Sequence, residues 1–392
     1  MNINAVNVYK VNLPFKFTFS HFQKDARAAD NIVVEILAHD QGLKGYGEGG
    51  PRPYVTGETQ ESAIRGVKSL CLNKLFPWHL EDVSQIWNFA YSATGAKNYN
   101  SALCALEMAL LDLLARKENR NIVNYLPEDH STHEVRYGGT VPMADRETVM
   151  PICEILKRFD IRHVRLKMGG NRAQNRRALE AIHQVMDPEC DLRVDVNGGW
   201  DLEMAKEHTA LIESYGVSVL EQPLMPEDPN WRELADILRP RKVKLMADES
   251  VCSMEDLEKA LSDGHFDVIN IRLSKCGGFS NSLRMINRIR TAGLGYQVGC
   301  QLGESGILSA AGRALCSISP DALYCDGSYD PFLLRENLTT KHVTFNHGGK
   351  AAPLKGPGLG VTVDQEKLRR FSNHFVTIEA PRSSLPGNAR PS

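Results

Sequence analysis

The stretch that decides the fold lies between residues 163 and 275, where short strand-like runs alternate with helical patterns. The runs are HVRLK at 163–167, LRVDV at 192–196, VSVLE at 217–221, VKLMAD at 243–248 and VINIRLSK at 268–275. Near the end of each run stands a charged residue, about 27 residues from the next: Lys167, Asp195, Glu221, Asp248 and Lys275. Strand, helix and strand at this period predict successive βα units of a parallel barrel.

The same period extends in both directions from this stretch. It predicts a first strand in EVRYGGTVPM at 134–143, with Thr140 near its end, and further strands in GLGYQVGCQLGE at 293–304 and ALYCDGS at 322–328. Eight strands are the number that closes such a barrel. Because the C-terminal ends of the strands line one pocket, we expect the three carboxylates and the two lysines to surround one cavity.

The N-terminal region has a different pattern. Residues 4–13 and 31–38 are strand-like, and the absence of a helical stretch between them favours antiparallel pairing. The segment between them, at 15–30, has two interpretations: a functional loop, or a strand edge in which Phe17, Phe19 and His21 alternate. Thr59 is the expected N-cap of the following helix, and the Ala/Leu-rich stretch 101–118 predicts a helix buried on several sides.

The fold class predicted is therefore α/β, a modified (β/α)8 TIM-type barrel with an N-terminal α+β capping domain. We expect the capping domain at 1–125, the catalytic barrel at 126–340 and a C-terminal segment at 341–378 that returns to the cap. Residues 379–392 have the composition of a disordered tail.

Composition narrows the classes of function. A net charge of −2 gives no reason to expect nucleic acid or a membrane surface as partner. The nine cysteines form no C-x-x-C pair, which argues against a zinc ribbon or a disulfide framework. With no signal-like N-terminus and no long apolar run, the sequence predicts a cytoplasmic protein.

The charged residues at the strand ends predict a chemistry. Three carboxylates without His or Cys form an oxygen-only site suited to Mg²⁺, with Mn²⁺ as a substitute. A single Asp at a strand end is more often a cap or turn residue, but three at barrel period favour a metal site. Arg165 lies two residues before Lys167, and a positive neighbour together with desolvation is expected to lower the pKa of a lysine towards that of a base.

These motifs resemble the enolase superfamily, and within it the muconate-lactonizing-enzyme subgroup. The resemblance spans almost the whole chain and is carried by RLK at 165–167, DVN at 195–197, EQP at 221–223, ADES at 247–250 and SKCGG at 274–278. It implies metal ligands at Asp195, Glu221 and Asp248, acid/base roles for Lys167 and Lys275, and a supporting role for Asn197. The implied reaction begins with removal of a proton α to a carboxylate, which gives an enediolate stabilised by Mg²⁺.

Departures from the family patterns bear on the substrate. Arg165 replaces the first lysine of the usual Lys-x-Lys and can clamp a carboxylate. Glu304 is expected in the place of the seventh-strand glutamate. Dipeptide epimerases hold a substrate ammonium group with an Asp-x-Asp motif, of which only Asp326 is present here, and this weakens the assignment as a dipeptide epimerase. The seventh strand has no clear catalytic histidine, which argues against the mandelate racemase subgroup. Specificity is expected from capping-loop residues: Phe19, His21, Arg27, Arg52, Tyr54 and Thr56.

The function predicted is that of a Mg²⁺-dependent racemase or epimerase of a small carboxylate, in which the two lysines act on opposite faces. The alternatives are a cycloisomerase and a β-elimination lyase, both through the same enediolate. A third hypothesis, a non-catalytic protein that keeps the fold, is disfavoured by the presence of all three carboxylates and both lysines. We also expect a homo-oligomer, as the resemblance implies.

Overall fold

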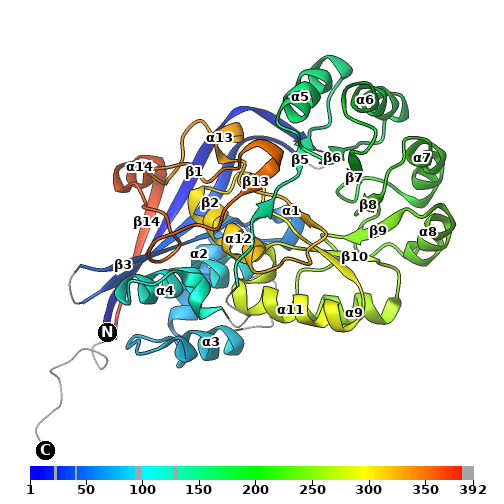
Figure 1. Ribbon diagram of the computed structural model, residues 1–392. Helices are drawn as coiled ribbons and strands as arrows, with labels where there is room; N and C mark the ends of the chain where they lie inside the picture. Colours follow the sequence, from blue (N-terminus) through cyan, green and yellow to red (C-terminus); the bar gives the residue numbers. More distant parts are fainter. Residues whose placement is uncertain (22–23, 40–41, 94–98, 127–130, 382–392) are drawn as a thin grey trace, which may run out of the picture.

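Two sheets organise the computed structural model, which describes residues 1–21, 24–39, 42–93, 99–126 and 131–381. An antiparallel sheet of four strands belongs to the N-terminal region, and a curved parallel sheet of eight strands follows it. In Figure 1 the parallel strands face inward and the helices that connect them lie outside, while the antiparallel sheet stands beside the barrel. No helix within the described ranges is both long and apolar enough to cross a membrane.

The parallel sheet has its strands in sequence order, each paired in parallel with the next. They are β5 (Gly139–Val141), β6 (His163–Lys167), β7 (Asp191–Asp195), β8 (Val219–Glu221), β9 (Lys244–Ala247), β10 (Val268–Ile271), β11 (Gly295–Val298) and β12 (Tyr324–Cys325). A parallel bridge between Tyr137 and Cys325 brings the last strand back beside the first. The predicted (β/α)8 TIM-type barrel is confirmed.

Amphipathic helices cover the outside of the barrel. They are α5 (Arg146–Arg158), α6 (Arg172–Val185), α7 (Leu202–Ser214), α8 (Trp231–Leu238), α9 (Met254–Asp263), α11 (Phe279–Thr291) and α12 (Gly306–Ser317). Side-chain caps start several of them, for example Asn171 before α6, Asp201 before α7 and Ser253 before α9. Because each helix follows a strand, all the strands point the same way and their C-terminal ends form one rim.

The antiparallel sheet has the order β14-β1-β2-β3. Its strands are β1 (Ile3–His21), β2 (Lys24–Ala38), β3 (Lys44–Gly49) and β14 (Ser372–Glu379), with β14 added from the C-terminal end of the chain. Helices α2 (Gln60–Cys71), α3 (Val83–Ser92) and α4 (Asn100–Lys117) complete this part. Thr59 caps α2 in a reciprocal capping box with Ser62, as predicted.

Helix α4 packs between the antiparallel sheet and the barrel and contacts both. It is buried from Asn100 to Ala115, which confirms the prediction from its Ala/Leu-rich sequence. A Cβ added to Gly47 of β3 would lie 2.0 Å from the carbonyl oxygen of Ala105 in α4, so this close approach requires glycine. On another face, Glu107 of α4 accepts hydrogen bonds from the backbone N–H groups of Phe279 and Ser280 at the start of α11.

The structure decides one alternative left by the sequence and corrects one predicted strand. The segment 15–30 continues as strand: β1 runs to His21 and β2 starts at Lys24, so the strand interpretation is correct and the loop interpretation is wrong. The run 268–275 is only half strand, because β10 ends at Ile271 and Lys275 lies in the short helix α10 (Leu273–Cys276). Gly277, at φ 87°, ends that helix in the left-handed region.

The expected domain boundaries and the tail stay predictions. Strand β14 extends to Glu379, and the Ala380 N–H donates to the carbonyl oxygen of Asn4. Residues 382–392, which make up most of the predicted tail, lie outside the described residues.

Candidate active site

The predicted acidic residues gather at the C-terminal rim of the barrel. Asp195 ends β7, Glu221 ends β8 and Asp248 follows β9 directly, and all three side chains are fully buried. Register places Asp195 beside Glu221 on neighbouring strands. Burial and then the charge of the neighbouring Asp195 raise the pKa of Glu221.

Cations neutralise these carboxylates in the structure. Lys167 Nζ lies 2.5 Å from Asp195 Oδ2, and Arg165 Nη1 lies 3.4 Å from Glu221 Oε2. The Arg272 guanidinium bonds to Asp248 and lies 3.7 Å from Glu221 Oε1. Burial alone would raise the pKa of Asp248, but Arg272 and Lys275 hold it below its ordinary value.

The donor set fits a hard divalent cation in its chemistry, since it offers carboxylate oxygens and no thiol or imidazole. As the side chains stand, no three His, Cys, Asp or Glu side chains of the described part form a ready-made metal cage. Each of the three carboxylates is bonded to a cationic side chain instead. Metal binding by Asp195, Glu221 and Asp248 would therefore require Arg272 and Lys167 to release their carboxylate partners.

Lys167 ends β6 and Lys275 lies in α10, just after β10, and these two strands are four apart in the ring of eight. Lys167 is 9% exposed, lines the cavity above the carboxylates and donates to Asn197 Oδ1 at 2.8 Å as well as to Asp195. Lys275 is fully buried and lies beneath the cavity surface. Its Nζ donates to the carbonyl oxygens of Asp248 (2.7 Å) and Asn270 (2.6 Å) and to Asp248 Oδ1 (3.0 Å).

The expectation that desolvation lowers the pKa of a pocket lysine is wrong for Lys275. Burial is the largest single influence and lowers the pKa of Lys275, but the Asp248 carboxylate at 3.0 Å and the neighbouring Cys276 and Cys252 act in the opposite direction, and together they raise it. A lysine that is fully paired with an acid keeps its proton, so whether Lys275 can act as a base depends on its contact with Asp248.

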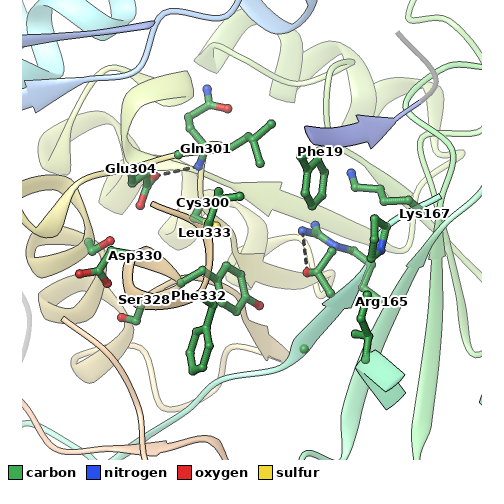
Figure 2. A pocket seen from close by; sticks show the side chains of 18 of the residues that line it. Phe19, Arg165, Lys167, Cys300, Gln301, Glu304, Ser328, Asp330, Phe332 and Leu333 are labelled. Carbon is green, nitrogen blue, oxygen red and sulfur yellow. Dashed lines mark hydrogen bonds between the residues drawn. The ribbon is translucent and has the colours of Figure 1, made fainter. Parts of the chain in front are cut away.

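A cavity of 320 Å³ opens above these residues, between the barrel rim and Phe17 and Phe19 of β1. Figure 2 shows Phe19, Arg165 and Lys167 on one side of it and Cys300, Gln301 and Glu304 on the other. Thr140 and Tyr54 also line it, and Thr140 Oγ1 lies 3.5 Å from Arg165 Nη2. Burial raises the pKa of Tyr54 above its ordinary value.

Other predicted residues have different positions. Asn197 lines the cavity and holds Lys167 and Glu249, with its backbone at φ 51°. Asp326 is buried inside the barrel, where Arg193 Nη2 lies 3.0 Å and Arg165 Nη1 3.3 Å from its oxygens, and these arginines bring its pKa to about 2 although burial opposes them. Glu304 lies on the wall and accepts from the Gln301 N–H at 2.8 Å, and burial followed by Glu48 raises its pKa to about 8.

Of the capping residues proposed from the sequence, Phe19 and Tyr54 line the cavity. Arg52 is buried elsewhere and donates to the carbonyl oxygen of Leu302, which joins the cap to the barrel. Thr56 is buried against Glu58, and Arg27 is exposed; neither lines the cavity. The backbone of His21 ends β1, but its side chain lies outside what the structure describes.

Sequence reasoning missed Arg272, Glu249 and the aromatic residues that line the cavity from the barrel side. Arg272 precedes Lys275 by three residues and Glu249 follows Asp248, so both were adjacent to residues already singled out. Phe332 lies in the short helix α13 (Asp330–Leu333), in a segment without a periodic pattern that could have marked it.

Comparisons with known proteins agree with this architecture. Residues 152–367 match the model of the enolase C-terminal domain-like family, and residues 3–126 match the N-terminal domain of the mandelate racemase / muconate lactonizing enzyme family. A hydrophobic dipeptide epimerase of Enterococcus faecalis is 26% identical over 92% of this chain and 100% of its own, and a chloromuconate cycloisomerase of Pseudomonas sp. is 27% identical over 95% and 99%.

A solved structure shows the same fold. The dipeptide epimerase from Cytophaga hutchinsonii, in complex with Mg and the dipeptide D-Ala-L-Val, superposes with a TM-score of 0.83 at 23% identity and covers 97% of this chain and 100% of its own. The two family models together span the cap and most of the barrel. The chain therefore belongs to the enolase superfamily, in its mandelate racemase / muconate lactonizing enzyme family.

Proposed function

We propose that this protein is a Mg²⁺-dependent isomerase that removes and returns a proton α to a carboxylate, as a racemase or epimerase of a small carboxylate. The observation that carries the proposal is the arrangement at the barrel rim. Lys167 lies on the cavity wall with its Nζ 2.5 Å from Asp195, and Lys275 lies in α10, after the strand half-way round the ring. Two amines on opposite sides of one bound carbon are what inversion through proton transfer requires.

Three carboxylates would hold the metal: Asp195, Glu221 and Asp248. Bound there, Mg²⁺ supplies stabilisation of the negative charge that develops on the substrate carboxylate as the α-proton leaves. The Mg in a structural neighbour of the same family supports this choice of metal.

The protein's own groups then have separate tasks. Arg165 and Arg272 line the cavity with their side chains nearly buried, and we assign their guanidinium groups the task of orienting a substrate carboxylate. Lys167, held by Asn197, exchanges a proton on one face. If Asp248 turns to a cation, Lys275 loses a partner and its Nζ becomes the group that serves the other face.

The experiment that tests the proposal is α-proton exchange in D₂O with Mg²⁺, followed by NMR over a panel of N-acylated amino acids, dipeptides, proline betaines and muconate-like lactones. We expect exchange with inversion in the native protein and a loss of roughly 100-fold or more in Lys167→Ala and in Lys275→Ala. Lys259→Ala is the matched control, because this lysine is 77% exposed and pairs with Asp263 on the surface.

The second candidate is a cycloisomerase, which the similarity to chloromuconate cycloisomerase favours. Exchange without inversion, together with ring closure or opening of a lactone, would replace the first proposal with this one. A vinyl product would indicate a β-elimination lyase. Native exchange rates in both lysine variants would contradict all three.

A further inference from the structure

Aromatic and aliphatic side chains line much of the cavity. Phe17 and Phe19 reach it from β1, and Phe159, Phe332 and Phe345 reach it from the barrel side. The barrel aromatics contact one another: the ring centroids of Phe159 and Phe332 lie 6.4 Å apart, and those of Phe332 and Phe345 lie 5.5 Å apart. Figure 2 shows Phe19 and Phe332 on different sides of this space.

Two of these rings remain unusually accessible. Phe17 is 50% exposed and Phe332 is 41% exposed, although most large apolar side chains of the described residues are buried. Aromatic side chains that line a cavity without filling it bind an apolar group favourably, because the group removes their surface from water.

The charged side chains on the cavity wall are mostly cations. Arg165, Lys167 and Arg272 all line it. Asp195, Glu221 and Asp248 are already paired with these cations, so a substrate with an ammonium group would need a further, free carboxylate on the wall.

None of the acids near the cavity is free to serve that purpose. Both oxygens of Asp326 are bonded to arginines, and the side chain is 2% exposed and does not line the cavity. Asp330 does line it, but its Oδ2 accepts from the Val343 N–H at 3.0 Å and its Oδ1 is buried with no contact to the cavity space. Glu304, whose pKa burial and Glu48 raise to about 8, is protonated at neutral pH.

We propose that the substrate is a carboxylate without an ammonium group, and that its uncharged apolar substituent packs between Phe17, Phe19 and Phe332. The inference rests on the proposed function for the place of the reacting carboxylate, near Arg165 and Lys167. It separates this chain from its relatives named as dipeptide epimerases, because a dipeptide has a free ammonium group and the described residues of the cavity wall offer that group no accessible, ionised carboxylate.

The test uses ligands that differ in one feature. N-propionyl-L-phenylalanine and L-alanyl-L-phenylalanine have the same skeleton and differ by the ammonium group, while N-propionyl-L-alanine lacks the aromatic ring. Affinities are measured by isothermal titration calorimetry with Mg²⁺ and the full chain. We expect N-propionyl-L-phenylalanine to bind at least about tenfold more tightly than either of the other two.

Phe17→Ala and Phe375→Ala form a matched pair of variants. Both rings are 50% exposed on strands of the same sheet, but only Phe17 lines the cavity. Phe17→Ala is expected to weaken N-propionyl-L-phenylalanine about tenfold and to leave N-propionyl-L-alanine unchanged. Phe375→Ala should change neither affinity.

Three results would each overturn the inference. L-alanyl-L-phenylalanine could bind as tightly as N-propionyl-L-phenylalanine or more tightly, none of the three ligands could bind, or the two variants could have equal effects. Exchange of the α-proton in D₂O, measured on the same ligands, separates it from the proposed function. Selective binding without exchange would support the inference and contradict the function. Exchange that is fastest on the dipeptide would support the function and overturn the inference.

Discussion

At the scale of single residues, Glu304 gives the cavity a dependence on pH. Burial and Glu48 raise its pKa to about 8, while Arg52 and Arg272 act in the opposite direction. Below pH 8 the side chain is neutral, and above it a negative charge appears on the cavity wall. An anionic ligand should therefore bind less tightly as the pH rises through 8, by roughly threefold or more.

Titration calorimetry with N-propionyl-L-phenylalanine between pH 6.5 and 9 measures this effect. Glu304→Gln keeps the shape and stays neutral at every pH, so its affinity should change less over the same range. The control is Glu189→Gln, which removes an acid that is 86% exposed. A dependence that survives unchanged in Glu304→Gln would assign the titration to another group.

Prediction of single residues from the sequence succeeded where a residue follows a strand. Asp195, Glu221 and Asp248 share the rim of the barrel because each comes at the end of a strand, which the period of the chain already indicates. The neighbours of a side chain across the barrel are not visible in such a pattern. Asp326 was predicted as a substrate-binding residue, but Arg193 from β7 and Arg165 from β6 bond to both its oxygens.

At the scale of elements, the ends of β7 provide a direct test of the proposed metal site. Asp195 and Asp191 lie at opposite ends of this strand; Asp195 pairs with Lys167, and Asp191 accepts a hydrogen bond from the Ser218 hydroxyl. A ligand that binds only the folded protein stabilises it, by about 2.7 kcal/mol at 100 times its dissociation constant. Mg²⁺ should therefore raise the thermal transition of the native protein and of Asp191→Asn, but not that of Asp195→Asn.

Differential scanning fluorimetry with Mg²⁺ and with EDTA provides the measurement. Each variant serves as its own reference, because the quantity compared is the shift caused by the metal. A shift of the same size in Asp195→Asn, or none in the native protein, would exclude the rim carboxylates as the metal site.

Elements with a strong local pattern were the ones predicted correctly. Helix α4 has apolar residues on all sides, and the barrel strands recur at a constant spacing. The hairpin of β1 and β2 was ambiguous, because its outer part extends beyond the sheet and alternates aromatic and polar residues. The second half of 268–275 has a strand-like composition but forms a short helix. There Arg272 and Lys275 make tertiary contacts to Asp248, which the local sequence does not indicate.

At the scale of the whole molecule, the cap and the barrel are joined by buried polar contacts, which should make them unfold together. Glu48 at the end of β3 is fully buried. It accepts hydrogen bonds from the Ser305 N–H (3.0 Å), the Ser305 hydroxyl (2.6 Å) and the Leu308 N–H (2.9 Å) at the start of α12 in the barrel. Glu48→Ala leaves two buried backbone donors without a partner, which costs roughly 2–4 kcal/mol of unfolding free energy.

Calorimetry should therefore record one transition for the native protein and one, at lower temperature, for Glu48→Ala. Glu61→Ala is the control, because this acid is 57% exposed and pairs with Lys10 inside the cap, so its loss should cost less than about 1 kcal/mol. Two separate transitions in Glu48→Ala would show that the cap folds independently of the barrel. A single shifted transition means that the cavity, which takes its aromatic wall from both parts, exists only while both are folded.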